Sequence, residues 1–123
     1  MDRYKLLNGG DLAFIGDAYL EIRIRKYVID KGITSLSKLH NECVKYVSRT
    51  SQYKIIQCLM EELSKEEREI FKRGRNYNYK DKSQEYVNAS GYEALIGYLY
   101  LNNMNDRLDY LINKSIEIIE KEE

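Results

Sequence analysis

The sequence predicts an all-α protein, and three observations predict it. The 123 residues contain no proline, and no stretch alternates cleanly between apolar and polar side chains as a half-buried strand would. Apolar residues instead recur at three- and four-residue spacing. Most of the seven glycines stand where helices would begin, end or pack closely. The chain, residues 1–123, is most simply one domain with one hydrophobic core.

Caps and apolar spacing predict the first three helices. A long helix is expected from about Asp11 to Lys31, with Gly32 as its stop. Its apolar face is expected to carry Leu12, Ile15, Ala18, Tyr19, Ile22 and Ile29. Ser35 can cap a second helix, with Leu36, Leu39, Cys43 and Val47. A third helix should begin near Ser48 and contain Ile55, Ile56, Leu59 and Met60.

The second half of the chain is predicted to form three more helices. Ser64 and Glu67 have the spacing of a capping box, which opens a short helix that ends at Gly74. The polar, tyrosine-rich stretch from Arg75 to about Ser83 is expected to be an exposed, mobile loop. A helix follows from roughly Asn88 to Leu101. The last, amphipathic helix lies after Met104 and carries Leu108, Leu111, Ile112, Ile116 and Ile119.

Charge and cysteine content narrow the class of protein. Twenty basic and twenty acidic side chains cancel overall, so the whole protein is not a basic nucleic-acid binder. Basic residues nevertheless gather locally: residues 71–82 hold five Lys or Arg against Asp81 alone. Cys43 and Cys58 lie on apolar helical stretches, which predicts reduced, buried thiols. With no apolar signal core and no run long enough to span a membrane, a cytoplasmic protein is expected.

Two acidic residues lie in small, apolar helical surroundings. Asp17 stands between Gly16 and Ala18, and Glu93 stands between Tyr92 and Ala94. A carboxylate on a core-facing helix costs desolvation energy unless it has a partner, and a hard cation such as Mg²⁺ is a common one. The two helices could meet and form one acidic site.

The residues around these acids resemble a known family. The run Phe14-Ile15-Gly16-Asp17-Ala18 is similar to the signature of the ribonuclease III endonuclease domain, and residues 92–101 resemble the second acidic helix of that fold. The similarity is greatest to the Mini-ribonuclease III branch, which lacks a separate double-stranded-RNA-binding domain. Residues 72–76, with the sequence KRGRN, resemble the basic loop of that branch. The resemblance covers roughly Leu12 to the C-terminus.

The resemblance implies a fold, a reaction and partners. It implies an all-α ribonuclease III-like domain that forms a homodimer and uses Mg²⁺, with Mn²⁺ as a substitute, to cleave double-stranded RNA and leave a 5′ phosphate. It implies that Asp17 and Glu93 are the catalytic and metal-binding residues. Larger members of the family carry further acids at the positions of Gly10, Ala13 and Ser90. The implied substrate is the precursor of the large-subunit ribosomal RNA, with a ribosomal protein as a conceivable partner.

Basic residues near the predicted loop are candidates for RNA contact. Their charges could follow phosphates, and an amide could touch the minor groove of duplex RNA. The candidates are Lys72, Arg73, Arg75, Asn76, Lys80 and Lys82. The same charges could also be a solvated helix end. Lys45, Arg49 and Gln52 form a weaker candidate patch.

Other functions stay open at this point. A catalytically weak RNA-binding or ribosome-assembly module of the same fold is the main alternative, and a helical protein-interaction module is a third. A zinc site built from His40, Glu42, Cys43 and Cys58 is disfavoured because the spacing of Cys58 fits no common zinc finger.

Overall fold

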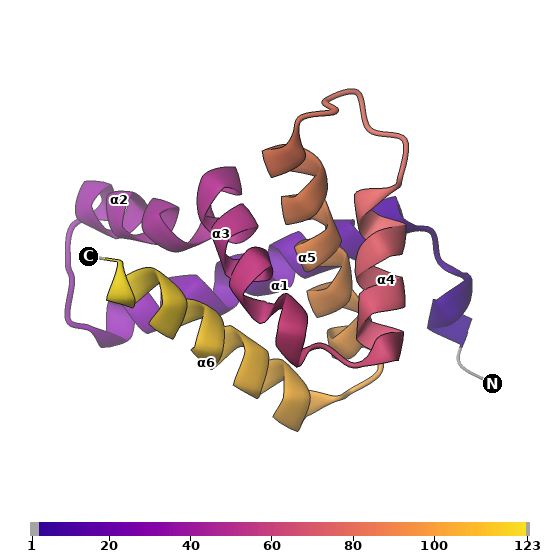
Figure 1. Cartoon of the computed structure of the whole chain (residues 1–123). Helices are drawn as coiled ribbons and strands as arrows, with labels where there is room; N and C mark the ends of the chain where they lie inside the picture. Colours follow the sequence, from indigo (N-terminus) through magenta and orange to yellow (C-terminus); the bar gives the residue numbers. More distant parts are fainter. Residues whose placement is uncertain (1–2, 123) are drawn as a thin grey trace.

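The computed structural model describes residues 3–122 and is built of helices (Figure 1). The α-helices are α1 (Gly9–Asp30), α2 (Leu36–Val47), α3 (Arg49–Leu59), α4 (Lys65–Arg75), α5 (Gln84–Leu101) and α6 (Asn105–Lys121). Short 3₁₀ helices are η1 (Arg3–Leu6) and η2 (Met60–Glu62). The predicted all-α fold is confirmed.

Helix α5 is the centre of the molecule. Its residues from Ala89 to Leu99 are all buried, whichever way their side chains point. A helix that is apolar on every side must be covered on every side. Helices α1, α3 and α4 pack around α5, and α6 crosses the front of the molecule (Figure 1).

Glycines let α1 and α5 touch through their backbones. A Cβ atom on Gly16 would lie 1.8 Å from the carbonyl oxygen of Glu93, and one on Gly97 would lie 2.1 Å from the carbonyl oxygen of Leu12. No side chain fits at either distance, so this crossing requires glycine. The residues next to Gly16 are therefore held against the middle of α5.

The buried face of α1 differs from the predicted one. The buried positions include Leu12, Gly16, Leu20, Ile24 and Val28, a strict four-residue repeat that follows from the glycine crossing. Leu12 was placed correctly, but the prediction was wrong for Ala18, Ile22 and Ile29, which are exposed. Apolar type alone could not separate the two faces, because α1 carries apolar residues on both.

In the second half of the chain, two helix boundaries differ from the predicted ones. The capping box at Ser64 and Glu67 is present as predicted, with both of its hydrogen bonds. Helix α4 ends at Arg75, one residue after the predicted end at Gly74, and a Cβ atom on Gly74 would lie 2.4 Å from that of Ala94, so this glycine is also a packing contact. Helix α5 begins four residues early, at Gln84, because Ser83 caps it.

Two smaller predictions also needed correction. Helix α3 ends at Leu59, and Met60 begins η2. Both cysteines are free thiols, but only Cys43 is buried, whereas Cys58 is exposed.

Over the described residues, no helix combines the length and the apolar character that a membrane crossing would need.

Candidate active site

Asp17 and Glu93 meet where α1 crosses α5. Asp17 follows Gly16, whose backbone touches the carbonyl of Glu93, so the two carboxyl groups come within hydrogen-bonding reach of each other. Asp17 is exposed, whereas Glu93 is only 3 % exposed. The two predicted acids therefore form one pair with an outer and an inner member.

Helix α3 supplies the other groups around Glu93. The Arg49 Nη1 atom donates to Glu93 Oε1 at 2.8 Å, and the Gln52 Nε2 atom lies 3.4 Å from Glu93 Oε2. Burial and the neighbouring Asp17 raise the pKa of Glu93, Arg49 lowers it, and together they bring it to about 8. A cation beside the pair would relieve this cost by favouring the ionised form.

A single serine places both α3 residues. Ser48 ends α2, and its hydroxyl accepts from the backbone N–H of Ser51 at 3.1 Å, so it also caps α3. Arg49 and Gln52 are then one helical turn apart and face the same way. The suggestion that Gln52 contacts RNA was wrong, because it is only 1 % exposed. Its spacing from Ile55, Ile56 and Leu59 was the signal that it lies on the buried face.

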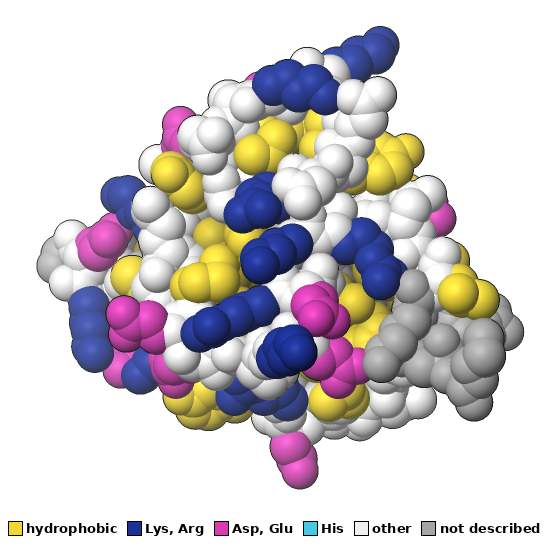
Figure 2. Space-filling view, turned by 45° about the vertical axis from the view of Figure 1, so that its right-hand side comes forward, with side chains coloured by type: hydrophobic (Ala, Val, Ile, Leu, Met, Phe, Trp, Pro, Cys, Tyr) yellow, Lys and Arg dark blue, Asp and Glu magenta, His cyan; other side chains and the backbone are white. Residues whose placement is uncertain are grey.

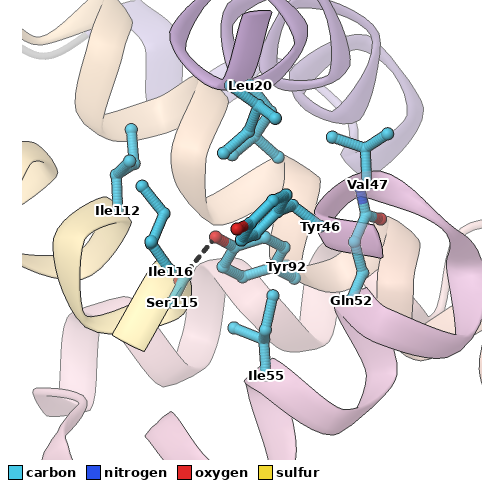
Figure 3. Close-up of a pocket in the computed structure, with 10 residues that line it drawn as sticks. Leu20, Tyr46, Val47, Gln52, Ile55, Tyr92, Ile112, Ser115 and Ile116 are labelled. Carbon is cyan, nitrogen blue, oxygen red and sulfur yellow. Dashed lines mark hydrogen bonds between the residues drawn. The ribbon is translucent and has the colours of Figure 1, made fainter. Parts of the chain in front are cut away.

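The core behind Glu93 is closed. Gln52 and Tyr92 line a cavity of 10 Å³ among apolar side chains, where the Tyr92 and Ser115 hydroxyls pair at 2.7 Å (Figure 3). This volume holds about one water molecule at most. An ion or a substrate could therefore reach the pair only from the side of Asp17 and Arg49.

The residues present fit a divalent cation held by few protein ligands. Two carboxylates face each other, and Gln52 Oε1 is the one buried side-chain polar atom without a hydrogen-bond partner among residues 3–122. Within that range no group of three or more His, Cys, Asp or Glu side chains gathers. Magnesium commonly takes one or two carboxylates and fills its other positions with water and phosphate oxygens. The donor set suits such an ion and does not suit structural zinc.

The predicted RNA-contacting residues lie on the last turn of α4 and in the segment that connects it to α5. Figure 2 shows Lys and Arg side chains along the surface over α4 and over the loop that follows it. Lys72, Asn76, Lys80 and Lys82 are exposed. Arg73 is half-buried and donates to the carbonyl of Leu7 at 3.1 Å, which ties part of its guanidinium to the fold. Arg75 is also half-buried, with its guanidinium over the ring of Phe71.

Tyrosines connect this loop to the acidic pair. The ring centroids of Tyr77 and Tyr79 are 5.0 Å apart, and those of Tyr79 and Tyr86 are 5.4 Å apart. Tyr79 also donates its hydroxyl hydrogen to the carbonyl of Gly74 at 2.8 Å. The Arg49 guanidinium lies 4.7 Å from the centre of the Tyr86 ring. The loop is exposed in large part, as predicted, but Tyr79 is half-buried and anchors it beside the site.

Comparisons with known proteins show which family the chain belongs to. Residues 10–104 match the Ribonuclease III domain family. The chain is 41 % identical to a Mini-ribonuclease 3 of Streptococcus pneumoniae, over 94 % of this chain and 95 % of that protein. It is 42 % identical to the Mini-ribonuclease 3 of Staphylococcus aureus, over 94 % and 91 %. The chain belongs to the Mini-ribonuclease III branch of the ribonuclease III family.

A solved structure supports the fold of this Mini-ribonuclease III family member. A crystal structure of a protein from Fusobacterium nucleatum superposes with a TM-score of 0.81 at 29 % identity, covering 92 % of this chain and 94 % of that one. The resemblance read from residues 14–18 and 92–101 is thereby confirmed. The chain is a ribonuclease of the ribonuclease III type.

Proposed function

We propose that the protein is a Mg²⁺-dependent endoribonuclease that cleaves double-stranded RNA, with Asp17 and Glu93 as the catalytic, metal-binding residues. The observation that carries the proposal is the meeting of these two carboxyl groups at the glycine crossing of α1 and α5. Membership of the ribonuclease III family supports the reaction class. Mn²⁺ is expected to replace Mg²⁺ because both accept octahedral oxygen ligands.

Asp17 and Glu93 are expected to have different roles because they differ in exposure to solvent. When bound, the cation supplies activation of a water and neutralisation of charge on the scissile phosphate. Asp17 is exposed and faces the substrate side. Glu93 would hold the ion from the buried side, and Gln52, enclosed in the core beside it, would keep its carboxylate in place. The closed core behind Gln52 keeps bulk water from the inner side of the site.

One cleavage assay tests this function. The purified protein is incubated with a long RNA duplex, its single-stranded counterpart and a DNA duplex, each with Mg²⁺ or with a chelator, and the product ends are mapped. We expect the RNA duplex alone to be cut, only with the metal, and to yield 5′-phosphate and 3′-hydroxyl ends. Tight binding without cleavage would instead support the RNA-binding or ribosome-assembly alternative.

The physiological substrate is proposed from the family resemblance. We propose the precursor of the large-subunit ribosomal RNA, cut at the stem formed by its two ends, with a ribosomal protein as a partner that presents it. Mapping the ribosomal RNA ends in cells depleted of the protein tests this substrate. Ends identical to those of undepleted cells would reject it.

The exposed lysines should contribute to RNA affinity through phosphate contacts. We expect the pair Lys72→Ala and Lys80→Ala to weaken duplex binding at low salt and to flatten the plot of log affinity against log salt by about 1.5, since each lost contact removes about 0.7–0.9. Fluorescence anisotropy across a salt series measures both effects. The matched control is Lys54→Ala with Lys121→Ala, exposed lysines on α3 and α6 outside this surface. Equal slopes for both double variants would mean that the surface over α4 and the following loop does not contact RNA.

A homodimer through α1 is supported by its exposed apolar side chains. Phe14 is 81 % exposed and Ile22 is 66 % exposed, and both lie with Ala18 on one face of the helix. An apolar stripe of this kind on a soluble domain marks an interface. The family as a whole forms homodimers, and a two-fold dimer would bury this face of both copies.

Phe14→Asp should therefore dissociate the dimer. A two-fold axis places Phe14 in the interface twice, once from each copy, so the loss of two buried aromatic contacts should raise the dissociation constant by at least about a hundredfold. Analytical ultracentrifugation over a concentration series measures it. Met104→Asp is the control, because Met104 is 41 % exposed at the start of α6 and an acid is tolerated there. A Phe14→Asp protein as dimeric as this control would place the interface elsewhere.

A further inference from the structure

The Arg49 side chain lies on the solvent side of the acidic pair. Its side chain is 42 % exposed, whereas that of Glu93 is 4 % exposed. The Arg49 Nη1 atom forms an ion pair with Glu93 Oε1 at 2.8 Å. This guanidinium and the exposed Asp17 therefore lie between Glu93 and solvent.

Both oxygens of Glu93 already have protein neighbours. Arg49 Nη1 donates to Oε1 at 2.8 Å, and Gln52 Nε2 lies 3.4 Å from Oε2. A divalent ion that binds Glu93 must share or replace one of these contacts. Gln52 is enclosed by the core and cannot move away, whereas Arg49 can. A positive ion would also repel the guanidinium but not the neutral amide.

Tyr86 gives Arg49 a second contact that does not depend on Glu93. The guanidinium lies 4.7 Å from the centre of the Tyr86 ring, within the range of a cation–π interaction. Tyr86 is itself packed edge-on against Tyr79 of the anchored loop. Arg49 can therefore lose its bond to Glu93 and still keep a favourable partner, which lowers the cost of displacement.

We propose that Arg49 is a positioning residue that holds Glu93 in the cation-free protein and is displaced toward Tyr86 when a divalent cation binds Asp17 and Glu93. The inference rests on the proposed function, because it takes these two acids as the ligands. Arg49 thus orders the buried carboxylate before the ion arrives and competes with the ion for it.

Cation binding without RNA tests this role. Mn²⁺ is titrated into the full chain by isothermal calorimetry and by electron paramagnetic resonance. Arg49→Gln should bind Mn²⁺ about tenfold more tightly than the wild type, since the competing charge is gone. Arg49→Lys, which keeps the charge, should stay closer to the wild type. Lys54→Gln removes the same charge from an exposed position of α3 and should have no effect.

A second variant keeps the inference testable if Arg49→Gln does not fold. Tyr86→Leu should bind Mn²⁺ about threefold more weakly, since displaced Arg49 then lacks its aromatic partner. Unchanged or weaker affinity in Arg49→Gln, or unchanged affinity in Tyr86→Leu, would overturn the inference about Arg49. A different result tests the proposed function itself: if Asp17→Asn binds Mn²⁺ as tightly as the wild type, the acids are not the ligands.

Discussion

Replacing Asp17 with Asn is expected to slow cleavage of duplex RNA by more than about a hundredfold, while duplex affinity changes by less than about threefold. The substitution removes a negative charge from the acidic pair but hardly alters its shape. It also leaves the basic surface over α4 unchanged, and that surface is expected to provide most of the affinity. Single-turnover cleavage and anisotropy on the same duplex separate the two effects.

The matched control for this prediction lies on the same helix. Asp30→Asn makes the same change at an exposed acid near the end of α1, where Asp30 pairs with Lys26 on the surface. It should cleave at the wild-type rate. If Asp17→Asn and Asp30→Asn cut equally fast, Asp17 has no part in the reaction, and the proposed active site is wrong.

Gly16→Ala is expected to destabilise the fold by about 3 kcal/mol or more and to abolish cleavage. The added methyl group would lie 1.8 Å from the carbonyl oxygen of Glu93. A backbone atom cannot rotate aside, so α1 and α5 must move apart, which also separates Asp17 from Glu93. Urea unfolding followed by circular dichroism, at one protein concentration because dimerisation adds to stability, measures the change.

A different glycine provides the comparison. Gly32 has φ +87° and nothing within 4 Å of a Cβ atom, and Asn tolerates this left-handed conformation. Gly32→Asn should therefore change the unfolding free energy by less than about 1 kcal/mol. A Gly16→Ala protein as stable as Gly32→Asn would mean that the two helices are not in backbone contact.

The sequence was sufficient for the parts of this fold that depend on local chemistry. The capping box at Ser64, the helical spacing and the two acidic runs each have a signal within a few residues, and the first two are present in the structure. The ion pair of Arg49 with Glu93 has no such signal, because 44 positions separate the two residues. Exposure of Ile22 was missed for the same reason, since the neighbours of a helix face are set by the tertiary fold.

Gly74 shows what the sequence alone could not determine. Gly74 could be read from sequence as a helix end or as a packing contact, and in the structure it is both, one residue before the end of α4 and against Ala94. Both interpretations use the missing side chain, but the second needs to know that Ala94 lies opposite. At Gly97, likewise, the sequence does not show that the backbone of Leu12 lies against it.

The backbone contact at Gly16 links the acidic pair to the thermal unfolding of the protein. An acid carried on a flexible segment could leave its partner while the remaining chain stayed ordered. Here Asp17 and Glu93 cannot part unless α1 separates from α5, and that separation dismantles the central packing of the molecule. We therefore expect the Asp17–Glu93 pair to be lost in the same cooperative transition in which the helices unfold.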